Sequence, residues 1–331
     1  MLRAAIVGLG WWGKQIATCL KDSDRIDLVG AVDVDPNGVG AFANAMALEL
    51  TDRYGDVLRD GAIDAVILAT PHGVHEEQVL AAAAAGKQVF CEKPLALTAD
   101  AAMRMLAACD DQGNVIGIGH ERRYEGALEE MKRMVDAGEL GTLLHVEMNW
   151  SHNRFAGAQA SGWRQDAKQA PAGTLTALGV HLTDYLQSVA GPIAEVSART
   201  SHRSPDFPGD DIISIQFSLA SGATAYLCNM ATTPFYQRIG IFGDRGWAEV
   251  REISNVDMPD PAVFSWCGLD EEIHSRTYKH TDTVRANLDA WADAVAGKSR
   301  YRFSREEKLH NVQILEAIVT SARTNTPQRV G

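Results

Sequence analysis

The sequence predicts an α/β chain in which a doubly wound parallel sheet is followed by a second α/β domain with a large, mostly antiparallel sheet. In the first third of the chain apolar strands alternate with helical segments, which is typical of a parallel sheet. A glycine-rich turn, GLGWWG at residues 8–13, joins the first strand to a helix. After about residue 122 the strands become longer and turns separate them, which indicates hairpins. We therefore expect one domain at residues 1–121 and another at residues 122–331.

The expected elements of the first domain are short apolar runs and amphipathic segments. The strands are expected at residues 4–7, 27–32, 65–69, 88–91 and 115–118, and the clearest helices at residues 12–20, 74–85 and 99–111. Ligands of doubly wound sheets bind beyond the carboxyl ends of the strands. The residues that follow each strand are therefore the first candidates for a functional site.

The expected elements of the second domain are a helix, a series of strands and two closing helices. The helices are expected at residues 125–137, 283–296 and 305–324, and the strands at residues 143–150, 193–201, 212–219, 224–229, 238–242 and 247–251. Ser221-Gly222 and Gly243-Asp244-Arg245-Gly246 provide turn residues between consecutive strands. This pattern predicts a mostly antiparallel sheet.

The turn at residues 8–13 has the spacing G-x-G-x-x-G of a dinucleotide-binding fingerprint. Gly8 permits the tight turn, Gly10 allows close approach of a pyrophosphate, and Gly13 allows the helix to pack near the strand. The helix N-terminus offers N–H groups and a positive dipole end to the phosphates. An ordinary βα turn is the alternative, but the strand and helix around it favour a cofactor site. The other residues of the turn at residues 8–13 are also expected at the cofactor, namely Leu9, Trp11 and Trp12.

Asp33 ends the second expected strand, 20 residues after Gly13. A carboxylate at this distance typically accepts a hydrogen bond from the adenosine ribose. It would repel the 2′-phosphate of NADP, and the following residues Val34, Asp35 and Pro36 provide no cation. The sequence therefore favours NAD, with a turn carboxylate as the alternative role of Asp33.

Composition limits the possible partners and locations. The chain has 331 residues, 46% of them apolar, and a formal net charge of -12. An acidic chain is a poor partner for nucleic acid, and the apolar runs are too short for a membrane span. The first strand begins within a few residues of Met1, and the five cysteines form no C-x-x-C pair. We expect a cytoplasmic protein with reduced thiols.

Several segments together resemble one family, the Gfo/Idh/MocA oxidoreductases, over nearly the whole chain. They are GLGWWG at residues 8–13, ATPHGVH at residues 69–75, GKQVFCEKPL at residues 86–95 and GVHLTDYL at residues 179–186. The resemblance implies an N-terminal Rossmann domain and a C-terminal α/β domain whose open-faced sheet often serves oligomerisation. It also implies an NAD(P)-dependent dehydrogenase or reductase of sugars, cyclitols or related hydroxylated compounds. A homo-dimer or homo-tetramer is therefore expected.

The resemblance implies that Lys93 and His181 are the catalytic residues. In the family, the lysine of Glu-Lys-Pro bonds the reacting hydroxyl and the matching histidine is the usual acid or base. An ammonium stabilises oxygen charge, and an imidazole exchanges protons near neutral pH. Pro94 is expected to form a cis peptide bond with Lys93. A solvated loop lysine and a buried packing histidine are the alternative roles.

The chain departs from the family pattern Asp-x-Gly-x-His, because Ala177 occupies the position of the Asp. Alanine cannot accept a hydrogen bond or orient the histidine ring. Asp184, one turn after His181, could take the place of the missing carboxylate, although the family often has a structural Asp there.

Further candidates come from the other segments that follow strands. Residues expected at the cofactor are Thr70, Pro71, His72, His75, Glu92, Lys93 and Pro94. Residues expected at the substrate, with Lys93, His181 and Asp184, are Arg122, Arg123, Tyr124, Trp163 and Arg164. No third ligand accompanies the two histidines, so no metal site is expected. Surface or interdomain ion pairing is the alternative role of the arginines.

These observations favour an NAD(H)-dependent oxidoreductase that transfers a hydride between nicotinamide and a small hydroxylated substrate such as a sugar or cyclitol. A first alternative is a dehydrogenase of a carboxylated substrate, such as an aromatic cis-dihydrodiol or a hydroxy acid. Arg122, Arg123, Arg164 and Lys168 would then pair with the carboxylate. A second alternative is a non-catalytic NAD-binding regulator, which the missing Asp at position 177 suggests.

Overall fold

The computed structural model describes residues 1–153, 169–205, 207, 209–252 and 259–331. The chain divides into two compact units, of which the first comprises Met1–Glu121 and Asp282–Leu309 and the second comprises Arg122–Thr281 and His310–Gly331. The first unit thus has two segments of the chain, and residues 282–309 belong to it. The two domains expected at residues 1–121 and 122–331 stay a prediction.

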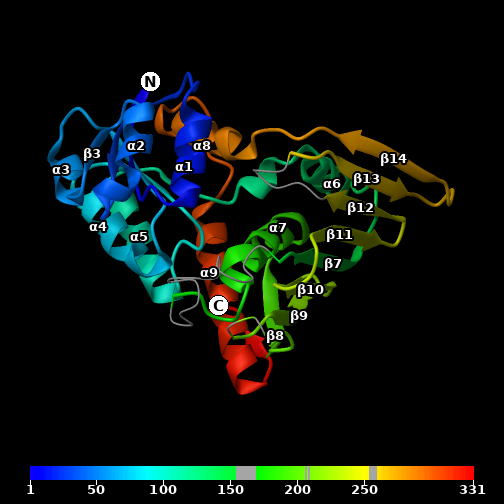
Figure 1. The fold of residues 1–331 in the computed structure, drawn as a ribbon. Coiled ribbons are helices and arrows are strands. Elements are labelled where there is room, and N and C mark those ends of the chain that lie inside the picture. The colour runs from blue at the N-terminus through cyan, green and yellow to red at the C-terminus, as the bar shows by residue number, and fades with distance from the viewer. Residues whose placement is uncertain (154–168, 206, 208, 253–258) are drawn as a thin grey trace. The chain divides into compact units, whose positions relative to one another are not determined.

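The first unit is built on a six-stranded parallel sheet with the order β3-β2-β1-β4-β5-β6 (Figure 1). Its strands are β1 (Leu2–Val7), β2 (Ile26–Val32), β3 (Glu49–Thr51), β4 (Ala65–Leu68), β5 (Gln88–Cys91) and β6 (Ile116–Ile118). Its helices are α1 (Trp11–Leu20), α2 (Pro36–Ala45), α3 (Tyr54–Arg59), α4 (His75–Ala84), α5 (Ala99–Asp111) and α8 (Thr283–Val295). The short helices η1 (His72–Val74) and η2 (Glu121–Tyr124) follow β4 and β6. This is the doubly wound sheet that the sequence predicts.

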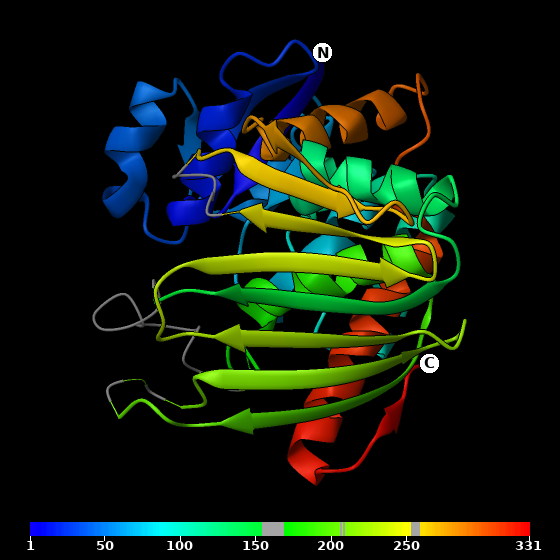
Figure 2. The ribbon, with the colours of Figure 1, turned by 90° about the vertical axis from the view of Figure 1, so that its right-hand side faces the viewer.

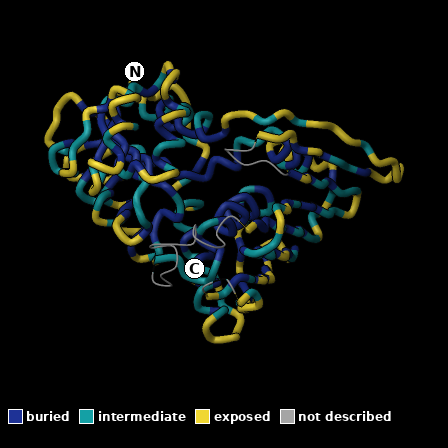
Figure 3. Tube along the Cα trace, in the orientation of Figure 1, coloured by how far each residue is buried: buried dark blue, intermediate teal, exposed yellow. Residues whose placement is uncertain are grey.

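The strand order reverses between β1 and β4, which lie side by side at the centre of the sheet. Residues 4–7 of β1 and all of β4 are apolar and buried. Buried residues are dark blue in Figure 3. Burial on both faces explains the continuous apolar runs AAIV and AVIL. The carboxyl ends of such neighbouring strands form the crevice in which ligands of this fold bind.

Helix α8 belongs to the first unit because its Trp291 fills a gap beside β5 and β6. The indole Nε1 donates to the carbonyl oxygen of Val115 at 2.9 Å, and the ring packs against Phe90 at 5.5 Å between centroids. A side chain at Gly117 would collide with this indole, since its Cβ would lie 2.8 Å from the ring. This packing is not visible in the hydrophobic pattern of α8, which is that of any amphipathic helix.

The second unit is built on a nine-stranded sheet with the order β14-β13-β12-β11-β7-β10-β9-β8-β15 (Figure 2). Its strands are β7 (Leu143–Ser151), β8 (Ile193–Ser201), β9 (Ile212–Leu219), β10 (Thr224–Met230), β11 (Tyr236–Gly243), β12 (Gly246–Glu252), β13 (Ala262–Cys267), β14 (Ile273–Tyr278) and β15 (Gln328–Arg329). Its helices are α6 (Gly126–Asp136), α7 (Val180–Ala190) and α9 (Arg305–Thr324), with a π-helical turn η5 (Leu175–Gly179) before α7. All described pairings are antiparallel except β7 with β10.

The strands of this sheet alternate between a buried and a solvent-facing side, as β9 shows most regularly. The helices of this unit lie behind the sheet in Figure 2, and no described helix of the unit lies on the side turned toward the viewer. In the described part of this unit, helices therefore cover the sheet on one face only, which agrees with the expected open-faced architecture. Among the described residues, no helix has the length and apolar character required to span a membrane.

Candidate active site

The turn between β1 and α1 has the geometry that the glycine pattern predicts. Gly8 has a φ of +92°, and a Cβ there would lie 2.7 Å from the carbonyl oxygen of Ala69. A Cβ at Gly13 would lie 1.9 Å from the carbonyl oxygen of Gly8, so only glycine lets the helix approach. At Gly10 a Cβ would meet nothing within 4 Å. The space above Gly10 is thus open to a ligand.

Asp33 is held against this turn by backbone hydrogen bonds. Its Oδ2 accepts from the backbone N–H of Leu9 at 2.7 Å, and its Oδ1 accepts from that of Asp35 at 2.9 Å. The carboxylate therefore links the end of β2 to the glycine-rich turn. Because each oxygen has a second lone pair, the group can still accept a bond from a ribose hydroxyl.

Two tryptophans begin helix α1. The Trp11 ring is 53% exposed and lies 5.6 Å from the ring of the half-buried Trp12, between centroids. The cap residue Gly10 provides no side chain, so the first N–H groups of the helix have no side-chain cap. These groups and the helix dipole favour an anion at this point.

The segment after β4 is fixed by His75. Its Nδ1 lies 3.0 Å from the carbonyl oxygen of Pro94 and its Nε2 lies 3.0 Å from that of Thr70. Burial lowers the pKa of His75, although these two carbonyls oppose the effect. His75 thus joins the loops that follow β4 and β5. The buried ring of His72 packs edge-on against the His75 ring, with 5.8 Å between the ring centroids. Pro71, which precedes His72 in the chain, is half-buried.

The segment after β5 carries Glu92, Lys93 and Pro94. The peptide bond between Lys93 and Pro94 is cis, as expected. Lys93 is half-buried, and its backbone N–H donates to Oε2 of Glu92 at 3.2 Å. Burial, followed by the charge of Glu121, raises the pKa of Glu92 to about 7, against the opposing effects of Trp12 and Lys93. The edge of the sheet therefore holds both a lysine and a carboxyl that titrates near neutrality.

These features fit a dinucleotide cofactor of the NAD type. The open space at Gly10 and the uncapped start of α1 suit a pyrophosphate, and Asp33 lies at the end of the neighbouring strand. The residues after β4 and β5 lie at the same sheet edge. The structure thus brings together, around the ends of β1, β2, β4 and β5, the predicted cofactor residues.

The second unit carries His181 at the beginning of α7. The π-helical turn η5 precedes it, and such turns are frequent at functional sites. His181 is buried, and its ring lies 5.7 Å from the Trp150 ring of β7, between centroids. A Cβ at Gly179 would lie 2.8 Å from Oδ1 of Asn229, so glycine lets the start of α7 approach β10.

Several buried polar atoms of the second unit have no hydrogen-bond partner in the described structure. They are Nε1 of Trp150, Oγ1 of Thr174 and Oδ1 of Asn229. The Asn229 amide is oriented by its Nδ2, which donates to the carbonyl oxygen of Trp150 at 2.7 Å. Buried polar groups of this kind normally find partners. A hydroxyl-rich ligand or water beside His181 would supply them.

The arginines that the sequence proposes for the substrate are engaged by protein carboxylates. Arg122 contacts Glu125 and Glu252, the latter at 2.9 Å, and its guanidinium lies 4.0 Å above the Trp150 ring. Arg123 forms a two-pronged pair with Asp184, with donor–acceptor distances of 2.7 and 2.6 Å. Of these five charged groups, all except Glu125 have side chains that are at least nine-tenths buried.

Asp184 is thus bound to Arg123, and its Oδ1 also accepts from the Gln187 side chain at 3.2 Å. Both carboxylate oxygens are used in this way. The suggestion that Asp184 replaces the missing family Asp stays a prediction. Tyr124 is half-buried beside the two arginines in η2, and Ala177 is half-buried within η5. The predicted substrate residues Trp163 and Arg164, with Lys168, lie outside the described residues.

Two residues of the site were missed at the sequence level. Glu121 was not proposed, although it lies three residues after the end of β6 and its charge acts on Glu92. Trp150 was placed only in a strand, whereas it packs against both His181 and Arg122. The position of Glu121 after a strand was a usable signal. The role of Trp150 depends on cross-strand register and could not be inferred from spacing.

Comparison with known proteins extends this description. Residues 2–120 match the oxidoreductase family with an NAD-binding Rossmann fold, and residues 128–249 match the GFO/IDH/MocA C-terminal domain. The chain is 31% identical over 289 residues to D-xylose 1-dehydrogenase (NADP(+)) 2 of Haloferax volcanii, covering 86% of this chain and 87% of that protein. It is 28% identical to inositol 2-dehydrogenase 2 of Saccharopolyspora erythraea, covering 89% and 85% of the two chains.

A solved structure has the same fold. Levoglucosan dehydrogenase in complex with NADH and L-sorbose superposes with a TM-score of 0.87 at 20% identity, and the match covers 100% of this chain and 99% of that one. At such low identity the similarity supports the fold alone. Together with the matches in sequence to both domains, the two sheets and the glycine-rich turn show that the chain belongs to the Gfo/Idh/MocA family of oxidoreductases.

Proposed function

We propose that the protein is an NAD(H)-dependent dehydrogenase of a small, neutral, hydroxylated substrate such as a sugar or cyclitol. The observation that carries this proposal is the gathering of the glycine-rich turn, Asp33 and Lys93 at the carboxyl edge of one parallel sheet. Relatives named as xylose and inositol dehydrogenases support the substrate class.

In this proposal Lys93 and His181 handle the hydroxyl proton. The bound cofactor supplies or receives the hydride. The ammonium of Lys93 donates a hydrogen bond to the reacting oxygen and stabilises the negative charge that develops there. The imidazole of His181 takes the hydroxyl proton during oxidation and returns it during reduction. Since Ala177 supplies no carboxylate, other groups must orient the His181 ring.

Asp33 supports NAD rather than NADP as the cofactor. Its carboxylate is fixed by two backbone N–H groups and keeps a free lone pair on each oxygen for a ribose hydroxyl. A phosphate on that ribose would meet a fixed negative charge. The relative from Haloferax volcanii is named for NADP(+), so the preference for NAD is proposed from Asp33 of this chain and not from that relative.

The neutral substrate class is favoured over a carboxylated one by the state of the arginines. Arg122 and Arg123 are paired with buried carboxylates of the protein. A substrate carboxylate would have to compete with these partners at a cost in desolvation. Polar atoms without partners, such as Asn229 Oδ1 and Trp150 Nε1, suit hydroxyl groups instead.

The experiment is an assay of sugars, inositols and carboxylated diols with NAD and NADP, followed by nicotinamide absorbance. We expect turnover of a neutral polyol, preferentially with NAD. Lys93→Met should reduce kcat by roughly 10²–10⁴-fold while cofactor affinity remains nearly unchanged. Lys298→Met, on an exposed side chain of the same unit, is the matched control. A near-normal rate in Lys93→Met would remove this residue from the chemistry.

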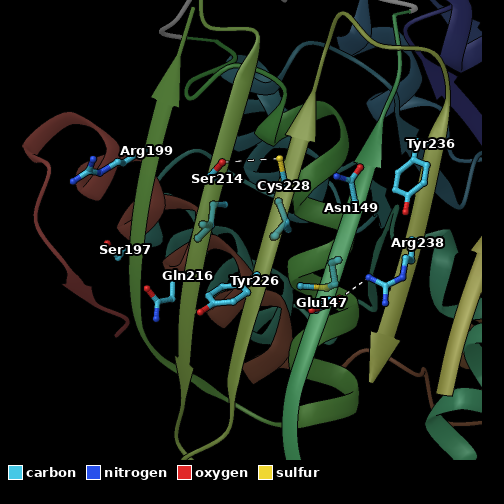
Figure 4. Close-up of a pocket in the computed structure, with 13 residues that line it drawn as sticks. Glu147, Asn149, Ser197, Arg199, Ser214, Gln216, Tyr226, Cys228, Tyr236 and Arg238 are labelled. Carbon is cyan, nitrogen blue, oxygen red and sulfur yellow. Dashed lines mark hydrogen bonds and ion pairs between the residues drawn. The ribbon is translucent and has the colours of Figure 1, made fainter. Parts of the chain in front are cut away.

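We also propose that the open face of the nine-stranded sheet binds a second copy of the chain. A shallow pocket of about 560 Å³ lies on this face, between strands β8, β9, β10, β7 and β11 (Figure 4). Tyr226 and Tyr236 on its floor are 51% and 43% exposed. Arg238 of β11 forms an ion pair with Glu147 of the neighbouring strand β7. Tyrosine and arginine are enriched in protein–protein interfaces relative to the rest of the surface.

Light scattering at micromolar concentration tests this second proposal. The protein should be a dimer or tetramer, and Tyr226→Glu should dissociate it by burying a charge at the interface. Leu269→Glu, in the exposed turn after β13, is the control and should leave the mass unchanged. A monomeric wild-type protein would contradict the proposal.

A further inference from the structure

Trp150 is a buried tryptophan of β7 that contacts His181, the candidate acid or base of the second unit. Along this part of β7 every second side chain is buried, and Val146, Met148 and Trp150 are the buried ones. Because alternate residues of a strand share a face, these three side chains lie on one face of the sheet. Helix α7, whose second residue is His181, packs against the same strand. The fold thus brings the indole to the start of α7.

The indole of Trp150 contacts two side chains that carry or can carry a positive charge. The imidazole of His181 lies 5.7 Å from the indole between ring centroids, and the two ring planes are tilted by 49°. The guanidinium of Arg122 lies 4.0 Å from the centroid of the indole, which is within the range of a cation–π contact. Trp150 therefore connects His181 to a buried cation of the same unit.

The indole is held by a row of buried side chains on neighbouring strands. Gln237 of β11 pairs with Trp150 in the register of the sheet, and Glu252 of β12 pairs with Gln237. The Gln237 amide donates to Oε2 of Glu252 at 3.1 Å, and the same oxygen accepts from Arg122 at 2.9 Å. From β10, the Asn229 amide donates to the backbone carbonyl of Trp150 at 2.7 Å. Regular strands, rather than a loop, thus fix the place of the indole.

We propose that Trp150 is a positioning residue for His181, and that its indole fixes the orientation in which the imidazole meets the reacting hydroxyl. The inference rests on the proposed function, in which His181 exchanges the proton of this hydroxyl. The torsion that rotates a histidine ring about its Cβ–Cγ bond has broad energy wells, so the ring needs contacts to stay in one orientation. A large ring on a regular strand supplies such a contact.

Alanine at position 177 gives the contact with the indole its importance. The family pattern has an Asp four residues before His181, whereas the methyl group of Ala177 cannot accept a hydrogen bond from an imidazole. A carboxylate orients the ring through one nitrogen, while an aromatic neighbour restricts the ring plane by packing, whichever hydrogen bonds the nitrogens make. Since proton transfer requires an aligned donor and acceptor, a ring free to tilt would slow the chemical step more than it would weaken substrate binding.

The first experiment compares two substitutions of Trp150 by steady-state kinetics with NAD⁺ and either D-xylose or inositol. Trp150→Leu removes the ring and should lower kcat roughly 10–100-fold, while KM stays close to the wild-type value. Trp150→Phe keeps an aromatic ring and should restore most of the lost kcat. Trp266→Leu is the matched control, since it removes an indole of β13 that stacks on His274 at 5.2 Å between centroids. It should keep the wild-type kcat.

Two kinetic results would overturn the positioning role of Trp150. One is a kcat equally low in Trp150→Leu and Trp150→Phe, because an aromatic ring would then not be what the site requires. The other is a raised KM at unchanged kcat in Trp150→Leu, which is the effect of a residue that binds the substrate without orienting His181. Urea denaturation checks that the variants are folded, and Trp150→Met replaces the leucine variant if that one does not fold.

The second experiment determines the orientation of the His181 ring in crystal structures of the wild-type protein and the two Trp150 variants, without substrate. We expect a single orientation in the wild type and in Trp150→Phe, and a second orientation in Trp150→Leu. A single, unchanged orientation in Trp150→Leu would overturn the inference. Absence of turnover by the wild-type protein with any polyol would contradict the proposed function instead, and the crystal structures would still decide whether Trp150 orients the ring.

Discussion

The carboxyl edge of the six-stranded sheet and the start of α7 hold the two sets of candidate residues, and they use charge differently. In the second unit, Arg122 and Arg123 are matched by buried carboxylates of the protein. At the sheet edge, by contrast, Glu92 and Glu121 act on each other as like charges near Lys93. Removing one partner of a buried ion pair destabilises the fold. Like charges in a buried site disfavour the ionised form of each carboxyl.

The largest expected effect comes from breaking a buried ion pair of the second unit, that of Arg123 with Asp184. Arg123→Ala leaves the Asp184 carboxylate, which is 3% exposed, without its guanidinium partner. Removing one member of a buried ion pair typically costs about 3–5 kcal/mol. We expect a loss of this size in the free energy of unfolding, measured by urea denaturation at neutral pH.

Arg133→Ala is the matched control for that loss. Arg133 also pairs with carboxylates, Glu130 and Glu139, but its side chain is 52% exposed. Exposed pairs contribute about 0–1 kcal/mol, so this variant should be nearly as stable as the wild type. If Arg123→Ala were equally stable and instead raised KM for a carboxylated substrate alone, Arg123 would be a substrate residue.

Most of the fold could be predicted from the sequence because both sheets have strong local patterns. The strands at 88–91, 193–201 and 212–219 have the predicted bounds, as does helix α9. Strands β3, β13, β14 and β15 were not predicted. Of these, β14 is mostly exposed and β15 has only two residues, so neither shows the alternation that a half-buried strand requires.

The candidate site could be predicted where the chemistry depends on backbone conformation. The turn at residues 8–13 requires glycine at fixed positions, and the structure shows why at Gly8 and Gly13. The partners of the charged residues, by contrast, depend on contacts between distant segments. Arg123 and Asp184, for example, form an ion pair although they are 61 residues apart. Local sequence does not contain that information, and the buried environment of Glu121 was missed for the same reason.

The next effect concerns Glu92 at the sheet edge and sharpens the comparison through the pH dependence of stability. The pKa of Glu92 is raised from 4.5 to about 7 in the folded protein, mainly by burial. Between these values the native state binds more protons than the unfolded chain, so stability falls as pH rises and then levels off. The loss amounts to roughly 3 kcal/mol.

Glu92→Gln should remove this contribution and be more stable than the wild-type apoprotein at pH values above 7. Urea denaturation across the acid-to-neutral range measures the two slopes. Glu77→Gln, at an exposed position of the same unit, should follow the wild type. Identical slopes for Glu92→Gln and the wild type would show that Glu92 is ionised in the native state throughout this range.

A smaller effect concerns Asp33 at the sheet edge, whose carboxylate accepts hydrogen bonds from two backbone N–H groups. Asp33→Ser removes the charge and at least one of its two bonds, to the N–H groups of Leu9 and Asp35. A lost hydrogen bond to a charged group costs about 1.5–3 kcal/mol. We expect weaker NADH binding and a reduced preference over NADPH, measured by calorimetry. Equal affinity of the wild-type protein for both cofactors would contradict the assignment of Asp33.

The smallest expected effect introduces a new charge beside His181. Ala177→Asp places a carboxylate in η5, four residues before His181. The family pattern Asp-x-Gly-x-His has an Asp at this position. A neighbouring carboxylate raises the pKa of an imidazole and repels an anionic substrate. At this half-buried position the effect should be about 1 kcal/mol, which corresponds to roughly fivefold. We therefore expect kcat/KM to fall by this factor for a carboxylated substrate and to remain nearly unchanged for a neutral polyol. Comparable gains with both substrates would instead mean that Ala177 leaves the His181 ring poorly oriented, and that the missing carboxylate is a loss of catalytic power rather than a determinant of specificity.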